Sequence, residues 1–366
     1  MKNVKIFAEH MEPGALSQFQ SAISQDFVLK AALMPDAHTG YSLPIGAVVA
    51  TDNMILPAWV GYDIGCGMCA VQTPLAAEEI APHREKIFSG IYRAIPTGFD
   101  HNKKPVDWDY QRYPMTPTLR RFFDKNGLKQ LGSLGSGNHF IEISRDEAGL
   151  VWVVIHSGSR NLGHSTATHY MKLASRSNKA REGHFGFRAD SDEGQDYITD
   201  MKFCLEFALK NRQEMIERVL REIYYLVRGG AHPETLKFIN RTHNHAELKD
   251  GAWIHRKGAT HAEKGMDGVI PGNMRDGSFI VVGKGNEESL FSSSHGAGRA
   301  MSRTKAKEAI KMETFASQME GITSKVRPST LDEAPDAYKN IFEIMTLQKD
   351  LVEVTHHLKP LINIKA

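Results

Sequence analysis

The chain has 366 residues, of which 41% are hydrophobic and 24% are charged. This composition is that of a globular protein with a substantial buried core, and it excludes disordered and fibrous classes. The balance of 45 Lys and Arg against 43 Asp and Glu gives a formal net charge of +2, which excludes a uniformly basic coat for nucleic acid, so local clusters of cations would have to hold any phosphate partner.

Short apolar runs separated by glycine and proline predict strands at 45–50, 58–60 and 151–155. A helical period of apolar residues predicts the longest helix over 201–228, ended by Gly229 and Gly230. Further strands are expected at 252–254, 278–282, 351–354 and 361–364, and helices near 303–317 and 335–349. Because the strands spread over the whole chain without regular strand-to-helix alternation, we expect an α+β fold: a single mixed α and β domain over residues 1–366, with central β-sheets surrounded by helices.

The cysteines and the start of the chain indicate a cytoplasmic protein. Cys66, Cys69 and Cys204 are an odd number in a long chain, which favours reduced thiols over a disulfide framework. The polar start MKNVKIFAEH is unlike a secretion signal, and no apolar run approaches the ~20 residues of a membrane helix. We therefore expect no membrane partner.

The segment 60–69 carries the densest chemical signal. Its glycines allow tight turns that bring the Asp63 carboxylate and the Cys66 thiol into one small volume. A hard oxygen and a soft sulfur together suit manganese, iron, cobalt or zinc. Two alternatives stay open at this point: Cys66 and Cys69 form a redox pair or half of a zinc site, or the turn merely holds a structural cysteine.

Three further histidine-bearing segments have the character of strand ends or polar turns. His139 lies in 135–142, His156 follows the apolar run 151–155, and His243 lies in 241–245. Each alone is more often a hydrogen-bonded turn histidine. Together with Asp63 and Cys66 they predict a metal site, and two ions sharing one thiolate is one arrangement that these donors allow.

A second strong segment spans 283–303. His295 lies between a serine run and Gly296-Ala-Gly298, whose backbone amides can form an anion-binding nest. Arg299 and Arg303 add guanidinium groups that match phosphate. This combination predicts transfer of a phosphoryl or nucleotidyl group with His295 as the nucleophile. The alternative is a flexible glycine- and serine-rich loop.

Nine segments in one order resemble the RtcB-type RNA ligases, also called tRNA-splicing ligases. They are 34–38 (MPDAH), 61–68 (GYDIGCGM), 137–142 (GNHFIE), 156–160 (HSGSR), 242–244 (THN), 255–260 (HRKGAT), 271–274 (PGNM), 294–299 (SHGAGR) and 361–365 (LINIK). They run from about residue 30 to the C-terminus. The resemblance implies an RtcB-like fold and an enzyme that depends on GTP and manganese. Its activity would join an RNA 3′-phosphate or 2′,3′-cyclic phosphate end to a 5′-hydroxyl end.

The resemblance also implies a role for particular residues. One manganese ion would be held by Asp63, Cys66 and His139, and a second by Cys66, His156 and His243, with Cys66 bridging. His295 would attack the α-phosphate of GTP and become guanylylated, and the guanylate would then move to the RNA 3′-phosphate. The remaining matched positions are Asp36, needed for activity, Arg299 beside the nucleophile, and Asn138, Glu142, Ser278, Gly296, Gly298 and Lys365 around the guanylate.

The implied partners are RNA, GTP and two Mn²⁺ ions, with an archease-like protein as a candidate activator. The alternative enzyme is a metal-dependent phosphohydrolase or cyclic phosphodiesterase that uses the same metal cluster without His295 chemistry. The chain departs from the family's pattern at Asn273, where a serine is commoner, and at His245, where an aromatic or aliphatic residue is commoner.

Overall fold

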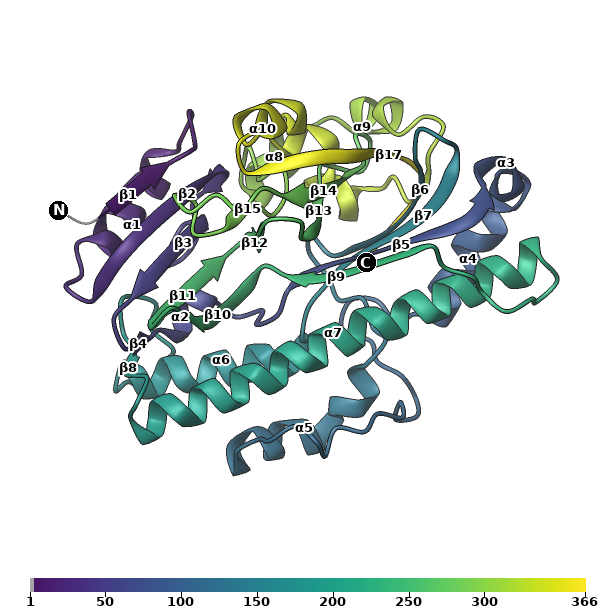
Figure 1. Ribbon diagram of the computed structural model, residues 1–366. Helices are drawn as coiled ribbons and strands as arrows, with labels where there is room; N and C mark the ends of the chain where they lie inside the picture. The colour runs from purple at the N-terminus through teal and green to yellow at the C-terminus, as the bar shows by residue number, and fades with distance from the viewer. Residues whose placement is uncertain (1–2) are drawn as a thin grey trace.

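The computed structural model describes residues 3–366, whose strands form two main sheets (Figure 1). The first sheet has five strands, and the central strand pairs in it are antiparallel. In spatial order they are β1 (Asn3–Ile6), β2 (Val28–His38), β3 (Ile45–Thr51), β11 (Ala252–Lys257) and β10 (Asn244–Lys249).

The second sheet has eight strands and carries most of the residues predicted to form the site. Its order is β13 (Asp267–Pro271), β14 (Ser278–Gly283), β17 (Val352–Lys365), β6 (Phe140–Arg145), β7 (Leu150–Ser157), β5 (Gly67–Ala76) and β9 (Lys237–Thr242), with β16 (Thr323–Ser324) beside β17. Two small pairs complete the strands: β12 (Ala259–His261) with β15 (Ser292–Ser294), and β4 (Met54–Ile55) with β8 (Phe187–Arg188). The expected mixed α and β fold is confirmed.

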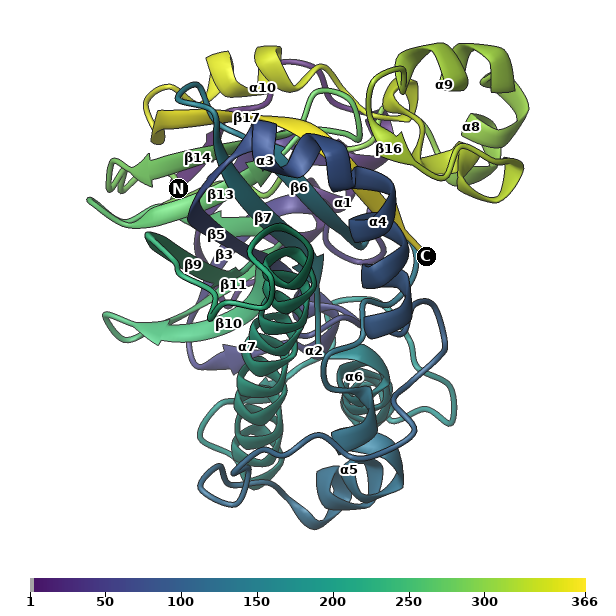
Figure 2. The ribbon, with the colours of Figure 1, turned by 90° about the vertical axis from the view of Figure 1, so that its right-hand side faces the viewer.

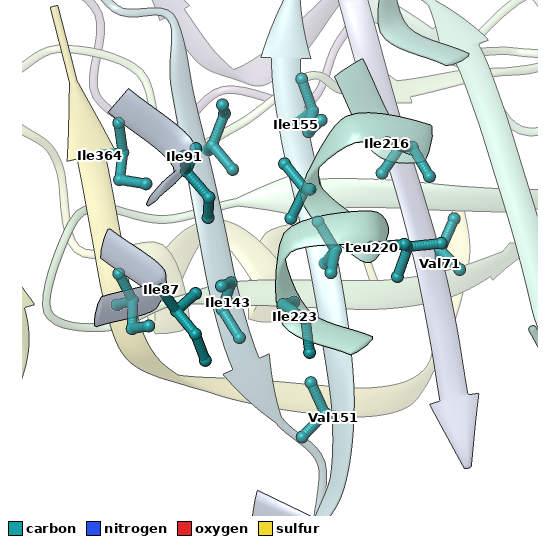
Figure 3. Packing of buried hydrophobic residues seen from close by; sticks show 14 of the residues in the cluster. Val71, Ile87, Ile91, Ile143, Val151, Ile155, Ile216, Leu220, Ile223 and Ile364 are labelled. Carbon is teal, nitrogen blue, oxygen red and sulfur yellow. The ribbon is translucent and has the colours of Figure 1, made fainter. Parts of the chain in front are cut away.

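One face of the larger sheet is covered by two helices, α4 (Arg84–Ala94) and the 36-residue α7 (Asp192–Val227). Figure 3 shows Ile87 and Ile91 of α4, and Ile216, Leu220 and Ile223 of α7, packed on the strands. Burying each such side chain stabilises the fold by about 1.5–3 kcal/mol. This layer fixes the sheet against α7, which is about 54 Å long at 1.5 Å per residue.

The pleat of β7 explains how one strand contributes side chains both to the hydrophobic core under the helices and to the candidate site on the opposite face. Val151, Val153 and Ile155 belong to the cluster under the helices, whereas Trp152 and Val154 pack in a separate cluster on the other face. Successive side chains of a strand alternate between its faces. His156 therefore falls on the face away from the helices.

Eight further α-helices lie around the sheets. They are α1 (Pro13–Ile23), α2 (Pro57–Val60), α3 (Ala77–Ile80), α5 (Pro117–Gln130), α6 (Arg160–Ala174), α8 (Arg303–Ala309), α9 (Met312–Gln318) and α10 (Ile341–Leu347), with three 3₁₀ turns at Ala81–His83, Pro328–Glu333 and Pro335–Ala337. Figure 2 shows α5 and α6 beside α7 at the lower end of the view, and α8 and α9 together at the upper end. Within residues 3–366, every helix is too short or too polar to cross a membrane.

Half of the predicted elements are confirmed as expected. The strands expected at 45–50, 151–155, 252–254 and 278–282 correspond to β3, β7, β11 and β14. The long helix ends as expected, because Gly229 and Gly230 both have positive φ. It starts earlier than its apolar period suggested, since Ser191 caps it by accepting a hydrogen bond from the backbone N–H of Gly194.

Five predicted elements differ from the structure, wholly or in part. The strand expected at 58–60 is the short helix α2, started by Pro57; a short buried apolar run does not distinguish a helical turn from a strand. The helix near 303–317 is two helices, because Ile310 and Lys311 are extended. Of 335–349, only α10 is α-helical. The strands expected at 351–354 and 361–364 are one strand, β17, whose register with β6 shifts after Pro360.

Candidate active site

The five side chains predicted as metal ligands lie in one continuous cluster. Cys66 Sγ is 3.4 Å from His139 Nε2 and 3.2 Å from His156 Nε2. His139 Nε2 is 3.1 Å from Asp63 Oδ2, and His156 Nε2 is 3.3 Å from His243 Nε2. Cys66 therefore lies between an Asp63–His139 pair and a His156–His243 pair, which is the order that a shared thiolate requires.

Strand pairing explains why these residues meet. Asp63 and Cys66 lie in the turn before β5, His139 directly precedes β6, His156 is next to last in β7, and His243 lies between β9 and β10. Because β5 pairs with β7 and β9, and β7 also pairs with β6, all four strand ends lie at the same end of the sheet. The cluster is a direct consequence of antiparallel register.

Two of the three histidines present their Nε2 atoms because their other ring nitrogens are engaged. His139 Nδ1 is 2.9 Å from the carbonyl oxygen of Leu134, and His156 Nδ1 is 3.2 Å from that of Asn138. Burial, and then neighbouring histidines, lower the pKa of His156 and of His243 well below the usual range. Neutral rings with one nitrogen fixed by a carbonyl are the form that binds a metal.

The charges of the cluster also fit a divalent cation. Burial, and secondly Asp63, raise the pKa of the Cys66 thiol well above its usual range. Burial opposes ionisation of Asp63 as well, but hydrogen bonds from His139 and Cys66 bring its pKa below the usual value. A bound cation supplies the positive charge that lets a buried thiol ionise. The donor set of one sulfur, one carboxylate and three imidazoles suits a divalent first-row transition ion such as manganese, iron, cobalt or zinc.

Cys69 lies outside this cluster. Its side chain is buried with Val71, Ile155 and the helices on the other face of β5. Burial raises the pKa of Cys69 to about 12. The geometry therefore disfavours the redox pair and the half zinc site that Cys66 and Cys69 left open.

His295 adjoins the cluster and is held by Asp36. The ring centroids of His243 and His295 are 4.9 Å apart. His295 Nδ1 lies 2.7 Å from Asp36 Oδ2, and the same oxygen accepts the backbone N–H of His295 at 3.1 Å. Asp36 is fully buried in β2, and its contacts fix the ring so that Nε2 is the nitrogen left for chemistry.

A cavity of about 510 Å³ opens beside His295. Nucleotide-sized ligands commonly occupy cavities of roughly 300–1,000 Å³. Gly298 has φ +73°, and a Cβ there would lie 2.3 Å from the Asp36 carbonyl oxygen, so this turn requires glycine. The predicted residues that line the cavity are Asn138, Glu142, His156, His295, Gly296, Gly298, Arg299 and Lys365.

Glu142 and Ser278 form the polar end of this group. Ser278 Oγ is 3.2 Å from Glu142 Oε1, and Ser144 Oγ is 2.7 Å from the same oxygen. Burial raises the pKa of Glu142 to about 7, although hydrogen bonds from both serines and from Asn363 favour the charged form. A carboxyl group poised near neutrality can accept hydrogen bonds from a donor-rich ligand edge.

The sequence comparisons agree with this geometry. The family model described as tRNA-splicing ligase RtcB matches residues 18–114 and 114–366. The chain belongs to the RtcB family. It is 35% identical to the RNA-splicing ligase RtcB of Escherichia coli K12, covering 97% of this chain and 95% of the relative. It is 31% identical to the tRNA-splicing ligase RtcB of Aeropyrum pernix, covering 84% and 82%. The expectation of a ligase family is confirmed.

In this RtcB chain the two arginines of the nest segment are paired with acidic groups. Arg299 donates to the Asp332 carbonyl at 2.8 Å and to Glu333 Oε1 at 3.3 Å. Arg303 donates to Asp332 Oδ2 and Glu333 Oε1, both at 2.6 Å. Lys365 Nζ also pairs with Glu333 and lies 3.4 Å from the Asn138 carbonyl oxygen. Glu333, which the sequence reasoning missed, therefore organises the cationic side of the cavity.

Two further missed residues of the RtcB chain lie on α7 and hold the turns that carry the candidate metal ligands. Arg212 Nη1 donates to the carbonyls of Gly65 and Ser157, each at 2.8 Å. Asn211 Nδ2 donates to the Ser157 hydroxyl at 3.2 Å and to the Gly158 carbonyl at 3.1 Å. The signal was present in the sequence, because both polar residues interrupt an apolar helical stripe, and a buried polar group needs partners.

Proposed function

We propose that the chain is a GTP- and Mn²⁺-dependent RNA ligase that works as one catalytic domain over residues 1–366. It would join RNA 3′-phosphate or 2′,3′-cyclic phosphate ends to 5′-hydroxyl ends, in RNA repair or tRNA splicing. The observation that carries the proposal is His295, fixed by Asp36 at 2.7 Å between a nucleotide-sized cavity and the Cys66 cluster. The names of the relatives, which are RNA-splicing and tRNA-splicing ligases, agree with it.

The first step uses His295 as a nucleophile toward GTP. Its Nε2 lone pair attacks the α-phosphorus, the new P–N bond forms, and the bond to pyrophosphate breaks. Asp36 holds the Nδ1–H and stabilises the positive charge that develops on the ring, as a carboxylate does for a catalytic histidine. The product is a guanylyl-histidine.

The nucleotide would be oriented by the chain's own polar groups. Glu142, with Ser278 behind it, can accept the N–H groups of guanine, and Lys365 and Asn138 lie at the same end of the cavity. The backbone of Gly296 and Gly298 approaches the phosphates without side-chain obstruction. Together these contacts would place the α-phosphorus next to His295.

Metal ions held by Asp63, Cys66, His139, His156 and His243 would neutralise phosphate charge as each bond to phosphorus forms. Positioning by Asn211 and Arg212 keeps these ligands in register. The five side chains would thus bind the metal ions, and the buried hydrogen bonds from Asn211 and Arg212 would keep those side chains in place.

The RNA end would enter through a second cavity of about 540 Å³ on the other side of the Asn138–His139 segment. Asn138 lines both cavities, while Asp63 and His139 line only the second. Arg160 offers a cation there, and Phe99, which is 98% exposed, offers a stacking surface for a base. Nucleotide and RNA can therefore approach the same metal cluster from opposite sides.

Guanylylation supplies the leaving group that the RNA phosphate lacks. A cyclic phosphate is first opened by water to a 3′-phosphate. Transfer of GMP from His295 to that phosphate forms a pyrophosphate linkage and frees the imidazole. Attack by the 5′-hydroxyl oxygen on the RNA phosphorus then forms the phosphodiester, expels GMP and releases one proton.

Labelling tests this proposal. The protein is incubated with α-labelled GTP and Mn²⁺, and we expect acid-labile, alkali-stable label on the wild type and none on His295→Ala. His232→Ala, which changes an exposed histidine that does not line the cavity, serves as the matched control and should be labelled normally. Label retained by His295→Ala contradicts the ligase chemistry, and an unlabelled wild type favours the phosphohydrolase.

A further inference from the structure

A second cluster of potential ligands lies apart from the Cys66 cluster, between β10 and β12. It consists of His245, Glu247 and His261, whose donor atoms all lie within 4.8 Å of one another. His261 Nε2 is 2.8 Å from Glu247 Oε1, and the ring centroids of the two histidines are 4.8 Å apart. The proposed function uses none of these three residues.

The donor set has the composition of a zinc site. Two imidazoles and one carboxylate, with a fourth position left for water, are a recurrent zinc ligand set. Ligand atoms on a tetrahedral zinc ion lie about 3.4 Å apart, given metal–ligand distances near 2.1 Å. Because the three donors are within 4.8 Å already, small side-chain rotations bring them onto one ion.

The cluster is partly exposed to solvent. His245 is 3% exposed, whereas the side chains of Glu247 and His261 are 33% and 18% exposed. A buried ligand backed by two partly exposed ones allows an ion to enter and leaves room for a bound water. Thr242 Oγ1 lies 3.3 Å from His245 Nδ1, which turns His245 Nε2 toward the cluster.

Arg256 is the group with which a cation competes. Its Nη1 is 2.5 Å from Glu247 Oε1 and 3.3 Å from His245 Nε2. Its other nitrogens donate to Ser292 Oγ at 2.8 Å and to the Leu290 carbonyl at 3.2 Å. An ion that takes over His245 Nε2 therefore leaves the buried guanidinium with its other partners. The contact with Arg256 shows that His245 Nε2 carries a lone pair toward the cluster, and an ion must displace Arg256 Nη1 to bind there.

The cluster is linked to the strands that carry the candidate active site. His245 is two residues beyond His243, and the Ala259 N–H donates to the His243 carbonyl at 3.2 Å. His261 ends β12, which pairs with β15, and β15 leads directly to His295. An ion that joins β10 to β12 would restrain both the turn with His243 and the strand before His295.

We propose that His245, Glu247 and His261 form a separate metal site that takes a divalent transition ion, with Zn²⁺ as its preferred occupant. The ion braces β10 against β12 and does not take part in the chemistry at His295. Zinc is favoured over manganese there because imidazole sites bind zinc more tightly in the order of first-row ions.

Metal counting on two variants tests the site. Cys66→Ala removes the shared ligand of the Cys66 cluster. Zinc that this variant retains after dialysis should therefore be bound at the cluster of His245, Glu247 and His261. We expect about one Zn²⁺ per chain in Cys66→Ala and none in Cys66→Ala/His261→Ala. His261→Ala is preferred to a substitution of Glu247 because it leaves the buried Arg256 paired. Cys66→Ala/His356→Ala, with a half-exposed histidine elsewhere, should retain its zinc.

A spectroscopic measurement keeps the proposal testable if Cys66→Ala fails to fold. In a chain that keeps Cys66, His261→Ala should bind one Co²⁺ ion fewer per chain than the wild type does. The thiolate-to-cobalt charge-transfer band of the Cys66 cluster should be the same in both proteins. A metal count that His261→Ala leaves unchanged overturns the proposal. GTP labelling, measured in parallel, fails or succeeds independently, because His261 is outside the machinery of the proposed ligase.

Discussion

At the scale of single residues, Glu142 gives the site a pH dependence. Burial raises the pKa of Glu142 to about 7, so the carboxyl is protonated below neutrality and ionised above it. Only the carboxylate accepts two hydrogen bonds from guanine N–H groups. We expect guanosine, which carries no phosphate to titrate, to bind about tenfold more tightly at pH 8 than at pH 6, as the ionised fraction rises through the pKa.

Isothermal titration calorimetry with guanosine measures this effect. Glu142→Gln should bind guanosine weakly and with little dependence on pH over the same range. Glu147→Gln, an exposed substitution in the turn after β6, should keep the wild-type dependence. Equal affinity of the wild type at both pH values would contradict the role assigned to Glu142.

The sequence identified some residues by chemistry and others only by resemblance. Cys66 and the three predicted histidine ligands were noticeable because several potential metal ligands fall in glycine-rich turns or at strand ends, and His295 because it adjoins a glycine-rich nest. Asp36 was named only through the family resemblance. Asp36 could have been noticed as a charged residue inside the apolar strand β2. The sequence alone does not tell which distant group hydrogen-bonds to such a buried carboxylate and offsets the cost of its desolvation.

At the scale of elements, α7 supports the turns that carry the candidate metal ligands. Arg212 is fully buried and its Nε also donates to Asn240 Oδ1 at 2.7 Å, so one guanidinium holds the segments before Cys66, after His156 and before His243. Arg212→Lys keeps the charge, but a single nitrogen cannot make all three contacts. We expect the affinity for Mn²⁺ to fall about 10- to 100-fold, as for other residues that orient metal ligands.

Equilibrium dialysis with Mn²⁺ gives the affinity, and circular dichroism of the metal-free protein checks the fold. Lys202→Ala, an exposed change on the same helix, is the matched control and should bind Mn²⁺ as the wild type does. If Arg212→Lys has wild-type affinity, α7 supports the fold but does not position the ligands.

The element predictions succeeded where periodicity alone decides structure and failed where tertiary contacts decide it. The apolar stripe of α7 and the buried runs of β7 and β14 are local properties of the sequence. The break between α8 and α9 depends on tertiary packing. Ile310 and Phe315 both pack into one cluster with Met274, and the extended residues between the helices make this possible. Likewise, β17 continues through Pro360 because β6 and β14 pair with its two halves.

At the scale of the whole molecule, the candidate metal cluster joins segments that are far apart in the chain. Its ligands come from residues 63 to 243, and they connect the ends of four strands of the larger sheet. An ion that binds the folded state and not the unfolded chain stabilises it by about 2.7 kcal/mol at 100 times its dissociation constant. Saturating Mn²⁺ should therefore raise the melting temperature of the wild type by several degrees, and a chelator should reverse the rise.

The two neighbouring cysteines separate metal binding from packing in this experiment. Cys66→Ala should abolish the Mn²⁺-dependent rise, because the shared thiolate serves both predicted ions. Cys69→Ala should lower the melting temperature by leaving a small void in the core, yet the rise on adding Mn²⁺ should persist. Scanning calorimetry of the three proteins with and without Mn²⁺ measures both effects. If Cys69→Ala loses the rise as Cys66→Ala does, the two thiols act as a pair, and the cluster centred on Cys66 alone is the wrong description of the metal site.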